Sequence, residues 1–234
     1  ERSKPEDYLH FNDFFTRSLK SDARPINTQA NTIISPVDGH ISQQGKIVGH
    51  QLVQAKGFQY TTHALLGGDI SLAKEFDQGD FSVIYLSPRD YHRIHMPLAG
   101  KLISMSYIPG KLFAVNPATV RTIPELFARN ERVILTFETA IGKVVLVLVG
   151  AIFVGSMEVT WMGKITPPYD HTLQYWDYHD ADISFQKGEE IARFNMGSTI
   201  ILLTQQDAID AFQLKSEGTD IKMGEVLTYQ KISQ

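Results

Sequence analysis

The residues with the clearest chemical potential form the segment Met196-Gly197-Ser198-Thr199 near the C-terminus. The hydroxyl of a serine that follows glycine can attack the preceding carbonyl, because glycine lacks the Cβ that would crowd the approach and tolerates a strained backbone. The attack moves the acyl group from nitrogen to oxygen. β-Elimination of the resulting ester, followed by hydrolysis, would leave a pyruvoyl group with loss of ammonia. A Gly-Ser-Thr tripeptide is also typical of an ordinary turn, so this interpretation depends on partners elsewhere in the chain.

Two upstream segments supply groups that could activate this serine. Residues 35–39 (Ser-Pro-Val-Asp-Gly) contain Asp38, and residues 85–97 contain His92 and His95. A serine hydroxyl is a poor nucleophile at neutral pH and needs a base. We predict that His95 is this base and that Asp38 orients it, as a carboxylate fixes the tautomer of an imidazole. The alternative for Asp38 is purely conformational, because Pro-Val-Asp-Gly is also a good β-turn sequence.

The two histidines also form a His-x-x-His pattern, which occurs in metal sites. A third ligand is not evident, because His63, His171 and His179 lie in unrelated contexts. We therefore predict no metal at this site.

These segments, taken together, resemble the bacterial, pyruvoyl-dependent type of phosphatidylserine decarboxylase, and the resemblance runs over nearly the whole chain. The family's self-cleavage motif is usually Leu-Gly-Ser-Thr, and the substitution of Met196 for leucine keeps an apolar side chain of similar volume. Further matching stretches are residues 11–17, 23–26, 54–57, 107–110, 126–133 and 165–168.

The resemblance implies a proenzyme that cleaves itself between Gly197 and Ser198, into chains of residues 1–197 and 198–234. Its cofactor would be a pyruvoyl group made from Ser198, with no external cofactor. The mature enzyme would convert phosphatidylserine to phosphatidylethanolamine and CO2 through a Schiff base between this group and the substrate amine. The resemblance assigns His95 to self-cleavage and His92 to the decarboxylation step, where it would protonate the carbanion.

Two other functions remain open from the residues alone. A serine hydrolase could use Asp38, His95 and Ser198 on an external ester or amide, although the Gly-x-Ser-x-Gly elbow is missing around Ser198. A β-rich binding module would use the Gly-Ser pair only as a turn. The polar segment 127–132 is either a binding site or a salt-bridged turn.

The composition is ordinary for a soluble globular protein, with 234 residues, 43% hydrophobic and 21% charged. The net charge of −4 offers no basic surface for nucleic acid, so we expect no nucleic-acid partner. The absence of cysteine excludes disulfides, thiolate metal sites and a cysteine nucleophile.

The longest apolar run, residues 144–154, is too short for a membrane-spanning helix and reads as a buried strand. The resemblance implies a preceding membrane-associated segment, a substrate embedded in a lipid bilayer, and a peripheral location on the cytoplasmic face of the bacterial inner membrane. A homodimer is one possible assembly. We expect apolar membrane contacts from Phe11, Phe14 and Phe15 and from the helix that carries Leu65 and Leu66.

The pattern of short β-branched runs punctuated by glycine predicts a mainly β fold of the α+β class. We expect one domain over residues 1–234, a β-sandwich or distorted barrel with peripheral helices and an N-terminal helical arm over residues 1–30. Helices are predicted at 7–19 and 61–76, the second divided at Gly67-Gly68, with a short helical turn at 122–127. The predicted strands are 81–86, 102–108, 132–138, 143–153 and 156–161.

Overall fold

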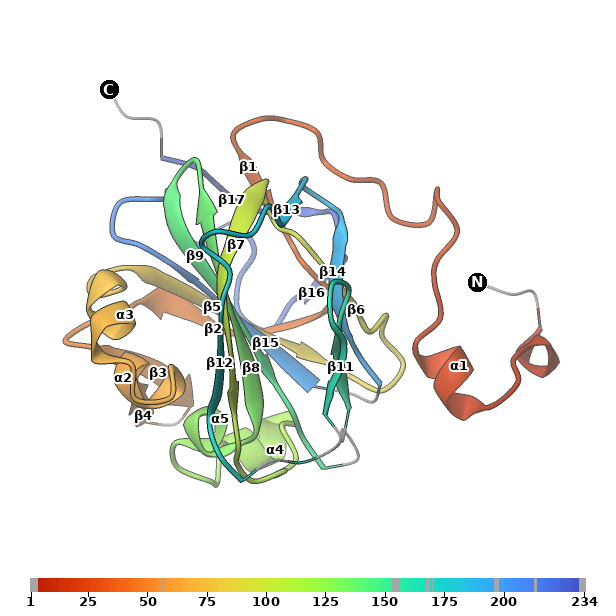
Figure 1. The fold of residues 1–234 in the computed structure, drawn as a ribbon, viewed down its shortest axis with the longest axis horizontal. Helices are drawn as coiled ribbons and strands as arrows, with labels where there is room; N and C mark the ends of the chain where they lie inside the picture. The colour runs from red at the N-terminus through yellow and green to blue at the C-terminus, as the bar shows by residue number, and fades with distance from the viewer. Residues whose placement is uncertain are drawn as a thin grey trace.

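Two antiparallel sheets face each other in the computed structural model (Figure 1), which describes residues 4–231 except 56, 153–155, 167–168, 170, 196–197 and 213. The nine-stranded sheet has the order β12 (Gln174–Asp177), β7 (Gly100–Ile108), β8 (Arg132–Thr139), β9 (Gly142–Val149), β15 (Ser198–Thr204), β5 (Asp80–Leu86), β2 (Gly39–Lys46) and β16 (Asp220–Ile221), with β13 (Ser184–Phe185) also paired to β7. The four-stranded sheet has the order β11 (Gly163–Thr166), β10 (Met157–Val159), β14 (Glu190–Phe194) and β6 (Arg93–His95).

The remaining elements are short. Two further strand pairs are β1 (Thr32–Ile34) with β17 (Val226–Tyr229) and β3 (Gln51–Ala55) with β4 (Phe58–Thr61). The helices are η1 (Pro5–Asp7), α1 (Phe11–Phe15), α2 (Thr62–Leu65), α3 (Ile70–Glu75), α4 (Pro117–Val120) and α5 (Leu126–Arg129). The mainly β fold is thus confirmed as two packed sheets, and the strands of the described residues do not close into a barrel.

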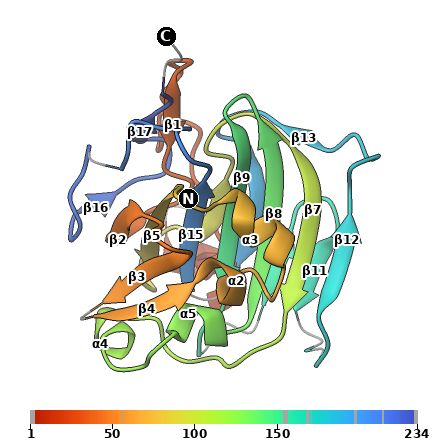
Figure 2. The ribbon, with the colours of Figure 1, turned by 90° about the vertical axis from the view of Figure 1, so that its left-hand side faces the viewer.

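The large sheet is covered on both faces, which explains the continuous apolar sequence of its central strands. Residues 144–149 of β9 are all fully buried, as are residues 200–203 of β15. Helices α2 and α3 lie on one face with the β3–β4 pair, and the small sheet lies on the other (Figures 1 and 2). A strand buried on both faces carries apolar residues without alternation, so the sequence pattern and the layering agree.

The helices are shorter than the sequence predicts. The predicted helix over 61–76 is divided into α2 and α3, because Gly67 and Gly68 adopt φ angles of 73° and 93° that end the first helix. The predicted helix over 7–19 contains only the five-residue α1, which begins where the side chain of His10 accepts a hydrogen bond from the amide of Asp13.

The N-terminal arm lies beside the small sheet and carries α1 (Figure 1). Phe11 and Phe14 are 61% and 38% exposed, as the membrane prediction requires, but Phe15 is buried. Leu65 and Leu66 are also buried, because α2 packs them into the core. The prediction that Phe15, Leu65 and Leu66 contact a membrane is therefore wrong.

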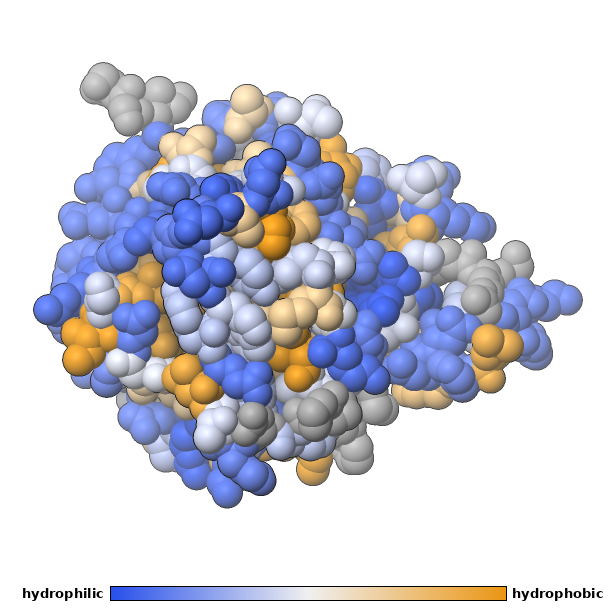
Figure 3. All heavy atoms as spheres, viewed as in Figure 1, coloured by the Kyte–Doolittle hydropathy of each residue, from blue (hydrophilic) through white to orange (hydrophobic). Residues whose placement is uncertain are grey.

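The apolar surface is divided into small areas. On the face shown in Figure 3, hydrophobic side chains form separate patches among hydrophilic ones. Among the described residues, no helix is long and apolar enough to cross a bilayer.

Candidate active site

The predicted cleavage site lies where the chain crosses from the small sheet to the large one. Strand β14 belongs to the small sheet and β15 to the large sheet, and residues 195–197 connect them. Ser198 is the first residue of β15 and pairs with Leu86, the last residue of β5. Met196 and Gly197 lie outside the described residues, and of Ser198 only the backbone is described.

A second crossing runs beside the first and carries the predicted histidines. Strand β5 leads through residues 87–92 into β6, which pairs with β14. The amide of Phe194 donates a hydrogen bond to the carbonyl of His92 at 3.0 Å. Because β5 also pairs with β15, this double crossing holds His92 close to the chain that leads into Ser198.

His92 is fully buried and has one unpartnered ring nitrogen. Its Nδ1–H donates to the carbonyl of Asp90 at 2.8 Å, whereas Nε2 has no partner among the described residues. Burial lowers the pKa of His92 to about 4, against the opposing effects of the Asp90 carbonyl and carboxylate. The imidazole is therefore neutral at pH 7, with its Nε2 lone pair available to accept a proton.

The ring of Phe15 covers His92. The two ring centroids are 3.9 Å apart and the planes are tilted by 36°. The N-terminal arm is held in this position by a hydrogen bond from Nε of Arg93 to the carbonyl of Thr16 at 2.9 Å. An aromatic side chain at this position excludes water from the imidazole, which is consistent with its lowered pKa.

His95 has partners on both ring nitrogens. Its Nδ1–H donates to the carbonyl of Gly188 at 2.8 Å, so Nε2 accepts a hydrogen bond from the hydroxyl of Tyr91, also at 2.8 Å. Burial lowers the pKa of His95, although the Gly188 carbonyl opposes this effect. His95 is thus a neutral imidazole whose basic nitrogen, Nε2, accepts the hydrogen bond from the Tyr91 hydroxyl.

Asp38 does not form the predicted hydrogen bond to His95. Its carboxylate accepts from Arg24 through Nε at 2.9 Å and through Nη2, and from the amide of Met223 at 2.9 Å. The ammonium of Lys222 lies 3.6 Å away. The predicted orientation of His95 by Asp38 is therefore corrected: the Gly188 carbonyl fixes the tautomer.

The physical reason is that Asp38 is only 1% exposed. A buried carboxylate needs close cations and donors, and here these come from the N-terminal arm and from the C-terminal segment. Burial alone raises the pKa of Asp38, but the Arg24 hydrogen bond, the Met223 amide and the two cations outweigh it and hold the pKa below its ordinary value. The negative charge still raises the pKa of His92 and of His95 slightly.

Tyr91 is the residue of this cluster that sequence reasoning missed. It lies within the segment 85–97, four residues before His95, and a tyrosine hydroxyl so close in sequence to a candidate base is a signal that could have been used. Burial, and next the charge of Glu190, raises the pKa of Tyr91, so the hydroxyl keeps its proton.

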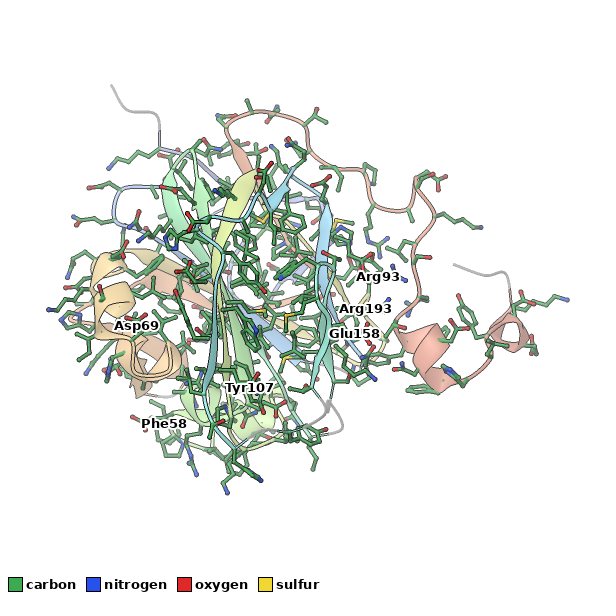
Figure 4. The ribbon with its side chains drawn as sticks, in the orientation of Figure 1. Phe58, Asp69, Arg93, Tyr107, Glu158 and Arg193 are labelled. Atoms are coloured by element: carbon green, nitrogen blue, oxygen red, sulfur yellow. The ribbon has the colours of Figure 1, made fainter. Side chains whose placement is uncertain are left out.

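A cleft of about 530 Å³ lies between the N-terminal arm and the small sheet. Residues 8–10, 12–13 and 16–18 of the arm form one wall, and Arg93, Glu158, Arg193 and Asn195 form the other. Figure 4 shows the first three of these projecting from β6, β10 and β14 on the side that faces α1. Asn195, in the wall of this cleft, directly precedes the Met-Gly pair of the predicted cleavage site in the sequence.

Ion pairs fix the small-sheet wall of this cleft. Arg193 pairs with Glu158, and Arg93 pairs with Glu190 at 2.8 Å. The side-chain amide of Asn195 donates to Glu158 at 3.0 Å. The wall is therefore polar, ordered and of mixed charge.

The chain belongs to the phosphatidylserine decarboxylase family, because the family model of that description matches residues 11–229. Its relatives named "phosphatidylserine decarboxylase proenzyme" include one from Nitrosococcus oceani, 53% identical over 229 residues that cover 97% of this chain and 74% of the relative. A second, from Shewanella sp. (strain MR-7), is 52% identical over 90% of this chain and 73% of the relative. A third, from Shewanella denitrificans, is 49% identical over 96% of this chain and 79% of the relative. The resemblance found in the sequence is thus confirmed.

Proposed function

We propose that this chain is a proenzyme that cleaves itself between Gly197 and Ser198 and then decarboxylates phosphatidylserine to phosphatidylethanolamine. The observation that carries the proposal is the double crossing between the sheets, which brings His92 close to the chain segment that precedes Ser198. The family to which the chain belongs supports the same function. The family relationship supports neither the serine hydrolase nor the binding module.

The strand pairing is compatible with a cut at this position. The end of β14 is held by β6 and β10, and the beginning of β15 is held by β5 and β9. The short chain would keep β15, β16 and β17, which pair with β9, β5, β2 and β1 of the long chain. Cleavage therefore severs a connection without removing a strand from either sheet, and the two chains stay together.

His95 is the base for self-cleavage in this proposal. Its neutral Nε2 accepts from Tyr91. In the proposed step the hydroxyl proton of Ser198 passes to the Tyr91 oxygen while the Tyr91 proton passes to His95, and His95 returns a proton to the nitrogen of residue 198 as the bond to Gly197 breaks. The Gly188 carbonyl holds the ring and stabilises the imidazolium that forms. Asp38 acts at a distance, because its ionised carboxylate favours a positive charge on His95.

The buried residues around Ser198 suit a pyruvoyl group. The unpartnered Nε2 of His92 is a polar atom that needs a partner, and it lies in a water-poor environment. The pyruvoyl group would supply a carbonyl that takes up the substrate amine and accepts the electrons released with CO2. His92, protonated at Nε2 during turnover, would deliver that proton to the carbon that has lost CO2.

The cleft between the arm and the small sheet is the proposed entrance for the lipid head group. Arg93 and Arg193 offer guanidinium groups that suit a phosphodiester, although both are ion-paired in the structure. The exposed Phe11 and Phe14 would place α1 at the bilayer surface. We propose a peripheral position on the cytoplasmic face of the inner membrane, with a homodimer as one possible assembly.

The activity is tested by incubating purified protein with phosphatidylserine in mixed micelles and measuring phosphatidylethanolamine and CO2. The wild type should form both, and the Ser198→Ala variant should form neither. A wild type that forms no product, but whose Ser198 is labelled by a fluorophosphonate, would support the serine hydrolase instead.

A further inference from the structure

Glu131 is a buried carboxyl group for which the reaction proposed so far has no use. It is 3% exposed and immediately precedes β8. Its Oε2 accepts a hydrogen bond from the hydroxyl of Tyr107 at 2.9 Å, whereas Oε1 has no partner among the described residues. A buried carboxyl oxygen without a partner is costly in a folded protein and calls for a functional explanation.

The neighbouring Arg132 does not neutralise this carboxyl group. Its guanidinium donates to the carbonyls of Leu65 and Ala64 at 2.6 Å and of Asn130 at 2.8 Å, on the α2 face of the sheet. Successive side chains of a strand point to opposite faces, so Glu131 faces the small sheet. The salt-bridged turn considered for residues 127–132 is therefore wrong.

The register of the large sheet places Glu131 and Ser198 in one row. Val149 pairs with Arg132 on one side and with Thr199 on the other. The residue that follows β9, Gly150, donates its amide to the carbonyl of Glu131 at 2.8 Å. Gly150 therefore separates Glu131 from Ser198 in this row, and their backbones are two strand spacings apart, about 10 Å.

The glycine in the middle of the row leaves room for the carboxyl group. A Cβ on Gly150 would lie 3.7 Å from Oε1 of Glu131, so this oxygen lies over the glycine, on the path toward β15. From Oε1 of Glu131, about half of the 10 Å between the two backbones then remains to Ser198. One bridging water molecule, or a rotation of the Glu131 side chain, would span this gap. Tyr107, which anchors the other oxygen, is labelled in Figure 4.

The surroundings of Glu131 favour a strong base. Burial raises its pKa, and the hydrogen bond from Tyr107 and the influence of the nearby Thr166 hydroxyl oppose this only in part. The titratable groups that face it are Tyr107 on β7 and Tyr169 after β11; burial and the charge of Glu131 raise the pKa of Tyr169. Unlike Asp38, Glu131 has no cation beside it among the described residues.

We propose that Glu131 is the base that completes the pyruvoyl group by removing the Cα proton of Ser198 at the ester stage, an assignment that rests on the self-cleavage proposed above. The Cα–H bond breaks and its electron pair forms the Cα=Cβ bond. The Cβ–Oγ bond breaks, and its pair leaves with the oxygen as the carboxylate of Gly197. The proton ends on Glu131, and water then displaces the nitrogen of residue 198 as ammonia.

The other candidate bases are less suited to this step. At the ester stage the hydroxyl proton of Ser198 has passed on to the nitrogen of residue 198, and the basic Nε2 of His95 is again hydrogen-bonded to Tyr91, with its pKa lowered by burial. Asp38 is engaged by Arg24 and by the amide of Met223. His92 is a weak base in its buried position, where its pKa is lowered to about 4.

The Glu131→Gln variant tests the proposal, because it keeps the shape of the side chain and removes the base. Freshly expressed variant should stop at the ester, and hydroxylamine should split it into a long chain and a short chain with a free serine N-terminus. Formation of the pyruvoyl-blocked short chain should slow by about 10²-fold or more. Asp80→Asn is the matched control: Asp80 is also buried with one unpartnered oxygen and a raised pKa, but it pairs with Thr204 at the far end of β15.

A second variant keeps the test decisive if Glu131→Gln fails to fold. Tyr107→Phe removes a hydrogen bond that favours the charged form of Glu131, so the pKa of Glu131 rises further. In the wild type the pyruvoyl-forming rate should increase with pH, and in Tyr107→Phe this increase should occur at higher pH. An unmoved profile would contradict the role of Glu131.

The outcomes separate this inference from the proposed function. A wild type that never cleaves, with or without hydroxylamine, overturns the self-cleavage itself. A wild type that matures normally beside a Glu131→Gln variant that matures at the same rate overturns only the assignment of Glu131. Stalling of the Asp80→Asn control to the same extent would also overturn it, since the effect would then be structural.

Discussion

The carbonyl of His92 accepts a hydrogen bond from the amide of Phe194 at 3.0 Å, and this bond joins the end of one connection between the sheets to the strand residue that directly precedes the other. Ser198 is the first residue of β15, which follows the connection 195–197, and His92 is the last residue of the connection 87–92. Residues more than 100 positions apart in the chain are thereby brought to one end of the large sheet. Both the proposed self-cleavage and the proposed decarboxylation use this arrangement.

His92→Ala should separate maturation from turnover. The variant keeps Ser198, His95 and Tyr91, so self-cleavage should proceed, whereas product formation should fall by roughly 10²-fold or more for loss of the proton donor. The measurement is phosphatidylethanolamine output, together with the enzyme–substrate adduct trapped by borohydride. Trapped adduct with little product is expected; wild-type turnover would exclude His92 as the essential acid, and failed cleavage would mean that the two histidines share or exchange roles.

Tyr91→Phe should slow self-cleavage, because the hydroxyl on Nε2 of His95 is the proposed path for the serine proton. We expect an effect smaller than that of His95→Ala, since the vacated Nε2 can still accept a proton through water. The measurement is the fraction of cleaved chain against time on a denaturing gel. Tyr175→Phe, at an exposed tyrosine, is the control. Faster cleavage in Tyr91→Phe would show that the hydroxyl competes with Ser198 for the base.

Stability should decrease as the pH falls from about 6.5 to 4. The pKa of His92 is lower in the folded than in the unfolded chain, so between these values the unfolded chain binds more protons and is stabilised relative to the folded one. A shift of this size corresponds to about 3 kcal/mol. The thermal midpoint should therefore decline less steeply with pH in His92→Gln than in the wild type. Parallel pH profiles would contradict the buried, neutral state of His92.

Membrane binding should depend on the exposed aromatic residues of α1. Replacement of Phe11 and Phe14 by serine removes apolar surface that is already exposed, so binding to liposomes should weaken while the fold is kept. Ile70→Ser, at another exposed apolar residue, is the control. Sedimentation with liposomes at low and high salt measures the effect. Binding that is lost on addition of salt would indicate electrostatic attachment instead, because salt screens charges and not apolar contacts.

Several features of the fold follow directly from local sequence. The apolar run in β9 predicts a strand buried on both faces, and Gly67-Gly68 predicts the division between α2 and α3. The length of α1 was not predictable from the aromatic spacing over 7–19. That spacing combines Phe11 and Phe14, which are exposed, with Phe15, whose ring packs against His92. Local periodicity does not record which tertiary contact an aromatic residue makes.

The sequence predicted which segments form the candidate site, but not the hydrogen bonds between their residues. Asp38 and His95 are recognisable from their motifs, yet the actual partners of Asp38 are Arg24 and the amide of Met223, the latter 185 positions away. His95 is oriented by a backbone carbonyl, that of Gly188, and every residue has such a group. The proposed role of Glu131 depends on the register that places it in one row with Gly150 and Ser198, which the sequence does not show.

The cleavage itself is tested most directly by the intact mass and the N-terminal chemistry of the freshly purified full-length protein. We expect two chains, a long one that ends at Gly197 and a short one that begins at residue 198 with a pyruvoyl group and is therefore blocked to Edman degradation. The Ser198→Ala variant should remain one folded chain. A wild type that stays uncleaved, or a short chain that begins with a free serine, would contradict the account.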